Sequence, residues 1–252
     1  RSRELFYYLV IREITVRYKQ TIVGFSWIFL QPLLSMLVLT LAFGNLFNKE
    51  GLLAPYPIFV YTGLLLWNFF AKTLSRTSES LIHNRSLITK VSFPKLLLPL
   101  SLMVVNLVDL LFAFLVFVPL LIYFHVTPNI YSIFPILLGL FILATLSLGI
   151  GTLLAPLTLK YRDVSFLFPY FIQIGLFLTP VIYPRSISHS QYQLIFDLNP
   201  LTSVIEYCRI SLFGKSLTSP DTLIYPLILG MFCLWIGIKF FTKSEKNLAD
   251  IV

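Results

Sequence analysis

Charged residues are scarce in this chain. Asp, Glu, Lys and Arg make up 12% of its 252 residues, whereas hydrophobic residues make up 57%. A soluble domain carries about 25% charged residues, so this composition excludes an ordinary water-soluble fold. The formal net charge of +8 would indicate a nucleic-acid partner in a soluble protein. Here the cations lie at the ends of apolar segments, which favours a role in membrane topology and predicts no nucleic-acid partner.

Residues that build metal and catalytic centres are also few. The two cysteines, Cys208 and Cys233, are isolated without a CxxC pair, and the three histidines are dispersed. Gly214-Lys215-Ser216 is similar to the end of a phosphate-binding loop, but Arg209 stands where that pattern needs a glycine. The sequence therefore predicts no catalytic residue, no metal site and no cofactor in this chain, and argues against an enzyme.

Long apolar runs are what the sequence does contain. Six are long enough to cross a hydrocarbon core of about 30 Å as helices, at about 1.5 Å rise per residue. We expect these spans at residues 28–47, 51–71, 96–124, 130–159, 164–183 and 222–241. The pattern predicts an all-α membrane protein, with residues 1–252 forming one domain of six transmembrane helices.

The distribution of Lys and Arg predicts the orientation of these spans. With the N-terminus inside, only Lys49, Arg185, Arg209 and Lys215 fall on the outer side, out of 19 cations. Cytoplasmic loops are enriched in Lys and Arg. We therefore expect a multi-pass protein of the cytoplasmic membrane with both termini in the cytoplasm.

A helix is expected before the first span, over residues 3–19. Its apolar stripe at helical spacing comprises Tyr7, Val10, Ile11, Ile14 and Tyr18. Leu5, Leu9 and Val16 lie off this stripe, so the helix is only moderately amphipathic. These features favour an amphipathic helix in the cytoplasmic interface of the membrane. The alternative is a helix packed on the cytoplasmic surface of the protein itself.

Another helix is expected in the long inner loop after the second span, over residues 78–91. Ser78-Glu79-Ser80 is a helix-start signal, and Phe93-Pro94 ends the segment. The candidate contact residues are Ser78, Glu79, Leu81, Ile82, Leu87, Ile88 and Val91. Apolar side chains projecting between Arg85 and Lys90 favour insertion into a partner protein. The alternative is a short helix folded back on the bundle.

The outer segment 184–213 contains apolar stretches that are too short to cross a membrane. Such stretches predict re-entrant or interfacial helices, which are tolerated only when packed against protein. In the fourth span, Ser147, Gly151 and Ala155 form a ridge of small residues. We expect this ridge to pack within the subunit rather than across a dimer.

Asp109 is the only acidic residue inside a predicted span. A charge there is costly unless it is paired or hydrated, which makes Asp109 a functional candidate. A partner such as Asn106 or an inner-loop cation would give it a purely structural role, and a role in transport is the alternative.

Four aromatic residues are candidates for a substrate path: Trp27 and Phe29 at the start of the first span, and Tyr170 and Phe177 in the fifth. Aromatic rings stack on the apolar faces of sugar rings, so a path lined with them would let a sugar chain slide. For each residue, lipid contact or a place in an interface belt is the alternative.

Several short stretches follow one another in a characteristic order and spacing. They are Arg17-Tyr18-Lys19, Gly24-Phe25-Ser26-Trp27, Gln31-Pro32-Leu33, Asn84, Leu87-Ile88-Thr89-Lys90, Phe93-Pro94-Lys95, Tyr161-Arg162-Asp163-Val164, Thr179-Pro180-Val181-Ile182-Tyr183, Asn199-Pro200-Leu201 and the charged tail 245–250. Together they resemble the permease subunit of type-2 ATP-binding cassette (ABC) exporters of polysaccharides. Gln31 departs from the asparagine that many relatives carry there.

This resemblance implies a homodimer in the inner membrane of a bacterium, with each subunit docked on a separate cytoplasmic ABC ATPase. ATP and Mg²⁺ would bind to that ATPase. Residues 78–91 would be the coupling helix that fits the ATPase, residues 3–19 the interface helix and residues 184–213 the outer re-entrant segments. The implied substrate is a lipid-linked polysaccharide of the O-antigen, capsule or teichoic acid type. The alternatives are an exporter of drugs or small lipids, and a membrane-embedded transferase acting on lipid-linked sugars.

Overall fold

The computed structural model describes residues 2–18, 26–47, 52–185, 193–214 and 220–245. These residues form helices and connecting turns, with no strand among them. Five helices are long and apolar enough to cross a membrane: α2 (Trp27–Phe47), α3 (Tyr56–Ser78), α6 (Leu97–Tyr123), α7 (Ile133–Lys160) and α11 (Ile224–Glu245). The prediction of an all-helical chain with membrane-length helices is confirmed.

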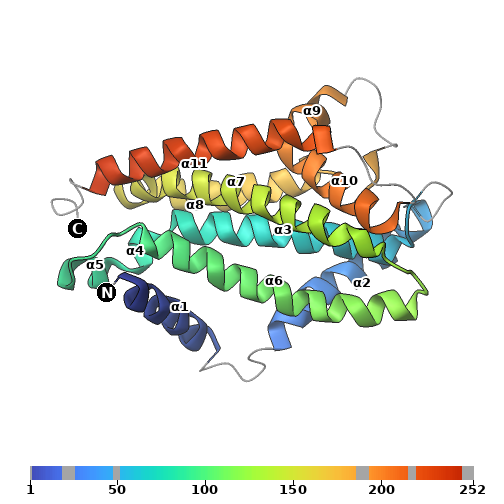
Figure 1. Ribbon diagram of the computed structural model, residues 1–252, viewed down its shortest axis with the longest axis horizontal. Coiled ribbons are helices and arrows are strands. Elements are labelled where there is room, and N and C mark those ends of the chain that lie inside the picture. Colours follow the sequence, from blue (N-terminus) through green and yellow to red (C-terminus); the bar gives the residue numbers. More distant parts are fainter. Residues whose placement is uncertain (1, 19–25, 48–51, 186–192, 215–219, 246–252) are drawn as a thin grey trace.

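The shorter elements are α1 (Ser2–Tyr18), α4 (Ser80–His83), α5 (Arg85–Lys90), α8 (Arg162–Leu178), α9 (Gln193–Leu198), α10 (Pro200–Phe213) and the 3-10 turns η2 (Ile130–Ser132) and η5 (Pro220–Leu223). All of them except α8 lie at one of the two ends of the bundle (Figure 1). The helices α1, α4 and α5 and the last turn of α11 lie at one end, which we call the collar end (Figure 1). The helices α9 and α10 lie at the opposite, far end.

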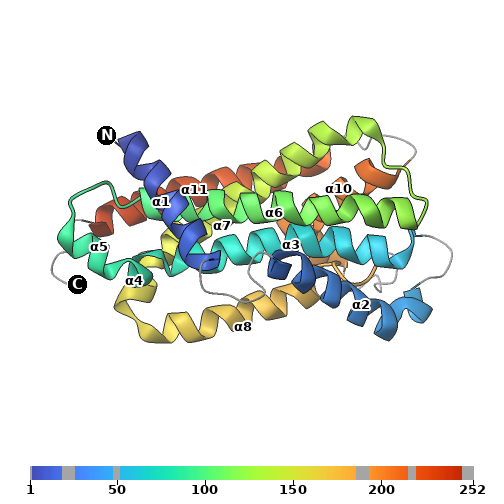
Figure 2. The same cartoon turned by 90° about the horizontal axis from the view of Figure 1, so that it is seen from below.

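The helix α3 is central, and most of its residues are buried. The helices α2, α6 and α7 all pack against it (Figures 1 and 2). The α3 helix follows Pro55 and continues to Ser78, beyond the predicted span end at residue 71. Lys72 lies inside this helix, and its ammonium donates a hydrogen bond of 3.0 Å to the side-chain oxygen of Gln31 in α2.

Close backbone approach holds α7 against its neighbours. A Cβ atom on Gly237 of α11 would lie 2.2 Å from the carbonyl oxygen of Gly149 in α7, so the glycines permit this contact. On the same helix, Ser147, Gly151 and Ala155 are buried, and Gly151 faces Thr77 of α3. The small-residue ridge therefore packs within the subunit, as predicted.

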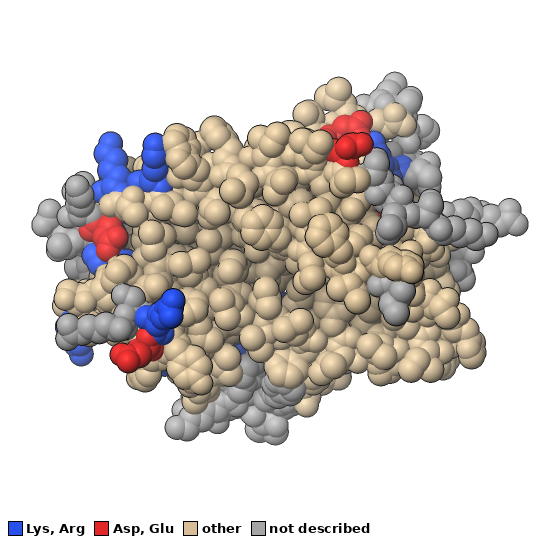
Figure 3. Space-filling model, in the orientation of Figure 1, with Lys and Arg blue, Asp and Glu red and all other residues tan. Residues whose placement is uncertain are grey.

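The surface is divided into charged ends and an apolar middle. On the face shown in Figure 3, the Lys, Arg, Asp and Glu residues that are described lie mostly towards the two ends. The broad region between them is almost entirely uncharged, and exposed leucine, isoleucine and phenylalanine side chains of α2, α6, α7 and α11 are typical of it. Such a belt matches the hydrocarbon layer of a membrane.

The fifth predicted span, residues 164–183, is shorter than expected as a helix. The α8 helix ends at Leu178, and Thr179 adopts an extended conformation before Pro180. Side chains satisfy the carbonyls freed by this break: Tyr183 donates to Phe177 (2.7 Å), Asn199 to Leu178 (3.4 Å) and Tyr56 to Ile182 (2.9 Å). Irregular backbone at membrane depth is tolerated when it is satisfied in this way.

The predicted outer segment 184–213 contains α9 and α10, and residues 186–192 lie outside the described part. The α10 helix begins at Pro200, and the side chain of Asn199 caps it by accepting a 3.0 Å hydrogen bond from the Leu201 N–H. Val204 and Ile205 are fully buried, so α10 packs against the bundle. Leu194 and Leu198 of α9 are exposed.

The N-terminal helix α1 packs on the protein through residues off its predicted stripe. Leu9 is buried together with Leu81, Leu98 and Phe241, and Leu5 packs against this cluster. The stripe residues Tyr7 and Ile11 are instead exposed. One face of α1 therefore contacts the bundle, while the predicted apolar stripe is partly exposed, at Tyr7 and Ile11, and half-buried at Val10 and Ile14.

Candidate functional site

The segment 78–91 is divided into two short helices, which corrects the prediction of one continuous helix. Ser78 is the last residue of α3, and Glu79 and Asn84 leave helical geometry, with φ −97° and −107°. The Asn84 side chain donates to the Ser80 carbonyl at 3.0 Å and accepts from Arg12 of α1. These contacts stabilise the break between α4 and α5, because an asparagine amide competes with the helix for backbone groups.

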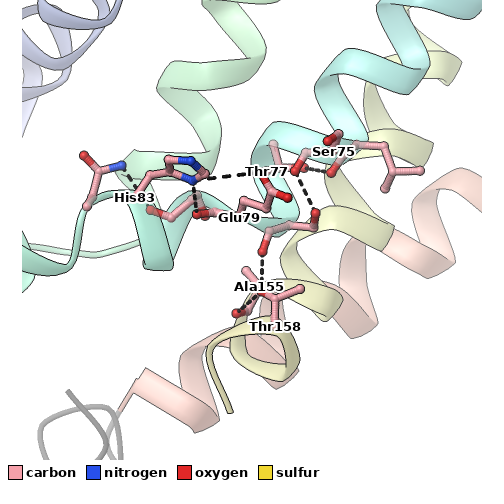
Figure 4. A network of polar contacts seen from close by, with 10 residues as sticks. Ser75, Thr77, Glu79, His83, Ala155 and Thr158 are labelled. Carbon is pink, nitrogen blue, oxygen red and sulfur yellow. Dashed lines mark hydrogen bonds and ion pairs between the residues drawn. The ribbon is translucent and has the colours of Figure 1, made fainter. Parts of the chain in front are cut away.

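The start of this segment is anchored on α7 (Figure 4). The Thr158 hydroxyl donates to the Ser78 carbonyl at 2.5 Å and to the Ala155 carbonyl at 2.9 Å. The Glu79 N–H donates to the Ser75 carbonyl at 3.2 Å, and His83 lies beside Glu79 in the next turn. The end of α3 and the beginning of α4 are thereby held in one position relative to α7.

The predicted docking residues fall into two groups. Ser78 and Leu81 are buried, and Leu81 belongs to the apolar cluster beneath α1. Ile82 and Val91 are exposed to 38% and 44%, and Glu79, Leu87 and Ile88 are half-buried. The exposed group lies at the collar end with the exposed cations Arg85 and Lys90. Only this outer group has the accessibility that contact with a partner requires.

A groove of about 660 Å³ lies beside this segment, between α1, the end of α3, α4, α5 and α6. It is lined by side chains of both charges, including Arg12 and Arg76 and the acids Glu13 and Glu79. Arg12 and Glu13 form an ion pair of 2.8 Å within α1. The groove gives the collar end a concave, polar surface next to the exposed residues of α4 and α5.

The candidate path residues lie mostly on the surface of the chain. Trp27, Tyr170 and Phe177 are exposed to 56%, 62% and 59%, and Phe29 is half-buried. Their helices, α2 and α8, lie on the same side of the molecule (Figure 2). The α8 helix approaches α3 closely at Gly175, where a Cβ atom would lie 2.9 Å from the Trp67 ring. The structure thus brings the two helices that carry the four aromatics to one side, and three of the four side chains are exposed.

Asp109 has a partner that the sequence did not indicate. Its carboxylate forms an ion pair with Arg17 of α1, and both side chains are largely buried, at 12% and 17% exposure. Asn106, the suggested partner, instead donates a 3.4 Å hydrogen bond to Thr73. The two residues are 92 positions apart in the sequence, so their pairing could not be predicted from local spacing.

Arg209 is a buried residue whose environment the sequence did not indicate. The sequence predicted only that it lies on the outer side, and the structure shows that it is 2% exposed. Its guanidinium donates to the carbonyls of Pro180 (2.6 Å), Val181 (2.7 Å) and Phe59 (2.9 Å), and it lies 3.6 Å from the centroid of the Phe59 ring. A lone cation within the apolar stretch 204–213 was the signal available in the sequence.

A second ionic group lies near Arg209 at the far end. Arg185 pairs with Asp197 of α9 and with Glu206 of α10, the latter at 3.4 Å. Burial raises the pKa of Glu206, while the neighbouring Arg185 opposes that shift. Together Arg185 and Arg209 connect the turn after α8 to both far-end helices.

Clusters suited to metal binding are absent from the described ranges: no group of three or more His, Cys, Asp or Glu residues lies close enough together. The geometry instead offers an apolar belt, an exposed aromatic side and a polar collar. These are features of a membrane subunit that moves or contacts other molecules.

Comparison with known proteins agrees with these features. Residues 4–213 match the family model described as ABC-2 type transporter. An O-antigen export system permease protein of Myxococcus xanthus, RfbA, is 28% identical over 259 residues, covering 99% of this chain and 98% of its own length. RfbA of Klebsiella pneumoniae is 26% identical and covers 98% and 96%.

More distant relatives also align along most of the chain. The capsule polysaccharide export inner-membrane protein CtrC of Neisseria meningitidis is 23% identical, covering 95% of this chain and 91% of its own length. The family model alone covers well over half of the chain and includes α1, the collar helices and α10. The chain therefore belongs to the ABC-2 type transporter family.

Proposed function

We propose that this chain is the permease subunit of an ATP-driven exporter that moves a polysaccharide of the O-antigen or capsule type out of a bacterial cell. The observation that carries this proposal is the near-complete alignment with permeases named for O-antigen and capsule export. The same observation favours polysaccharide over drugs or small lipids as the cargo. We infer that the exported chain is lipid-linked and that a polymer of the teichoic acid type is an alternative to the O-antigen and capsule types.

In this proposal the collar end faces the cytoplasm, and both termini lie there. The five long helices and α8 with the turn after it make six crossings. The exposed residues of the α1 stripe, Tyr7 and Ile11, lie in the membrane interface. The excess of Lys and Arg assigned to this side supports the orientation.

The partner is a separate cytoplasmic ATPase that supplies ATP and Mg²⁺ binding. It docks on the exposed residues of α4 and α5 and the residue after them, chiefly Ile82 and Val91. The buried Leu81 and the Thr158–Ser78 hydrogen bond give this surface a rigid base. Because the base is rigid, a movement of the ATPase can be transmitted to the transmembrane helices.

The path forms between two copies of the chain. The exposed side that carries α2 and α8 faces the second copy, so that Trp27, Tyr170 and Phe177 line a shared channel. The half-buried Phe29 contributes at its edge.

Deletion of the gene that encodes this chain, in the bacterium that carries it, tests the proposed function. We expect surface polysaccharide to be lost and the polymer to accumulate inside the cell, with both effects reversed by the wild-type chain. Unchanged surface polysaccharide with altered drug sensitivity would support the alternative of a drug exporter.

A further inference from the structure

A small cavity between three helices is lined by four polar residues together with apolar side chains. It lies between α2, α3 and α6 and is lined by Ile28, Pro32, Asn68, Lys72, Asn106 and Asp109, among others. Its volume of about 30 Å³ is enough for about one water molecule. Polar residues at such a position are expensive in a membrane, and they mark functional sites.

Two hydrogen-bond acceptors at the cavity, the side-chain oxygen of Asn106 and the carbonyl oxygen of Ile28, lack the usual donor. Asn106 is 2% exposed, and its side-chain oxygen has no hydrogen-bond partner among the described residues. Pro32 has no N–H, so the carbonyl of Ile28, one helical turn earlier, loses its usual intrahelical donor. One water has two O–H groups, which matches these two acceptors.

The charges around the cavity connect four helices. Asp109 of α6 pairs with Arg17 in the last turn of α1. Lys72 of α3 lines the same cavity as Asp109 and donates to Gln31 of α2. One carboxylate therefore lies near two cations, each of which belongs to a different helix.

The flexibility of Lys72 makes this arrangement adjustable. A lysine ammonium on its four-carbon stem can change partners, whereas a paired arginine is held in a planar geometry. Lys72 is a cation that lines the cavity together with Asp109, so it can approach this carboxylate when Arg17 moves with α1. Lys72 would then turn to Asp109 and release Gln31 of α2.

We propose that Asp109 is a positioning residue that links α1 to α2 through Lys72 and one ordered water in this cavity. Displacement of α1 at the collar thereby changes the position of α2, the helix that carries Trp27. The role of this link in transport rests on the proposed function, in which α1 lies beside the docking surface and α2 lines the path. The link between the helices does not depend on the cargo.

Pulsed electron paramagnetic resonance on the full chain in lipid nanodiscs tests the link without the ATPase. Spin labels at Tyr8→Cys of α1 and Leu41→Cys of α2, both at exposed positions, report the distance between these helices. The background carries Cys233→Ser, and labelled chains are diluted with unlabelled ones. We expect one narrow distance in the wild-type chain and its loss in Asp109→Asn.

Restoration of the narrow distance by the charge exchange Arg17→Asp with Asp109→Arg separates a specific link from general damage. If Asp109→Asn does not accumulate, Arg17→Gln tests the same link, and adding Lys72→Met should broaden the distance further. Distances unchanged in both Asp109→Asn and Arg17→Gln would overturn the proposal.

A second readout uses the complex with its ATPase. We expect Asp109→Asn to export less polymer per ATP hydrolysed, by about fivefold or more, which is the lower end of common coupling between sites. If the wild-type complex exports no polysaccharide while the distances respond as stated, the proposed function fails and the helix link stands.

Discussion

Arg209 of α10 donates a 2.9 Å hydrogen bond to the carbonyl of Phe59 in α3, and its guanidinium lies over the ring of the same residue. The contact leaves no space for a side chain at Gly63, where a Cβ atom would lie 2.1 Å from the guanidinium. Because Arg209 also donates to the carbonyls of Pro180 and Val181, it joins α3, α10 and the turn after α8.

Replacing Arg209 with Met should destabilise the far end. Three carbonyls would lose a charged donor, and unsatisfied buried acceptors make the expected loss about 3 kcal/mol. Thermal unfolding of the purified chain measures this change. Arg185→Met is the control, because a partly exposed ion pair contributes less than about 1 kcal/mol. Equal effects of the two substitutions would contradict the role assigned to Arg209.

A charge on the exposed docking surface should separate binding from folding. We expect Ile82→Asp to insert normally but to lose copurification with the ATPase, because the charge would be buried unpaired in an apolar contact. Thr242→Asp, which adds the same charge at an exposed position on the collar end of α11, is the control and should copurify. Retained copurification and export in Ile82→Asp would exclude α4 as part of the docking surface.

The buried neighbour Leu81 should behave differently from Ile82. Leu81 is 0% exposed and packs with Leu9 and Leu98, so Leu81→Asp places an unpaired charge in an apolar cluster. We expect little folded protein, measured as the monodisperse fraction after solubilisation. A normal yield of Leu81→Asp would show that this cluster is not needed for folding.

Cysteine labelling tests the orientation of the bundle. We expect an impermeant thiol reagent added outside intact cells to modify Leu194→Cys at the far end and to spare Arg85→Cys at the collar end. Cys233→Ser removes one background thiol. The other, Cys208, is buried, and burial raises the pKa of its thiol to about 12, so it should not react. Labelling at position 85 and not at position 194 would indicate the opposite orientation of the chain in the membrane.

The aromatic path is tested by a pair of substitutions on α8. Tyr170→Ala with Phe177→Ala should lower export and leave assembly and basal ATP hydrolysis unchanged, because two stacking surfaces for sugar rings are lost. The matched control is Phe232→Ala, an equally exposed aromatic on α11, which lies away from α8 in Figure 2. An equal fall in export for the control would indicate a general effect of removing lipid-facing aromatics.

The sequence by itself determined that the chain is helical and membrane-embedded. Runs such as residues 28–47 and 96–124 are too long and too poor in charge for any other solution, because a bilayer requires internally satisfied backbone. Pro55, Asn199 and Pro200 likewise mark helix starts, since their effect on the backbone is local. The helix at the N-terminus was predicted, although its packing face was not.

Only the tertiary structure decided the partners and faces of these helices. Spans that are apolar all round carry no rotational signal, so the exposure of Trp27 and Tyr170 could not be deduced from their spacing. The pairing of Arg17 with Asp109 and the burial of Arg209 depend on helices distant in sequence. The break at Asn84 was missed for the same reason, because Arg12 of the distant helix α1 donates to the Asn84 side chain and so helps to stabilise it.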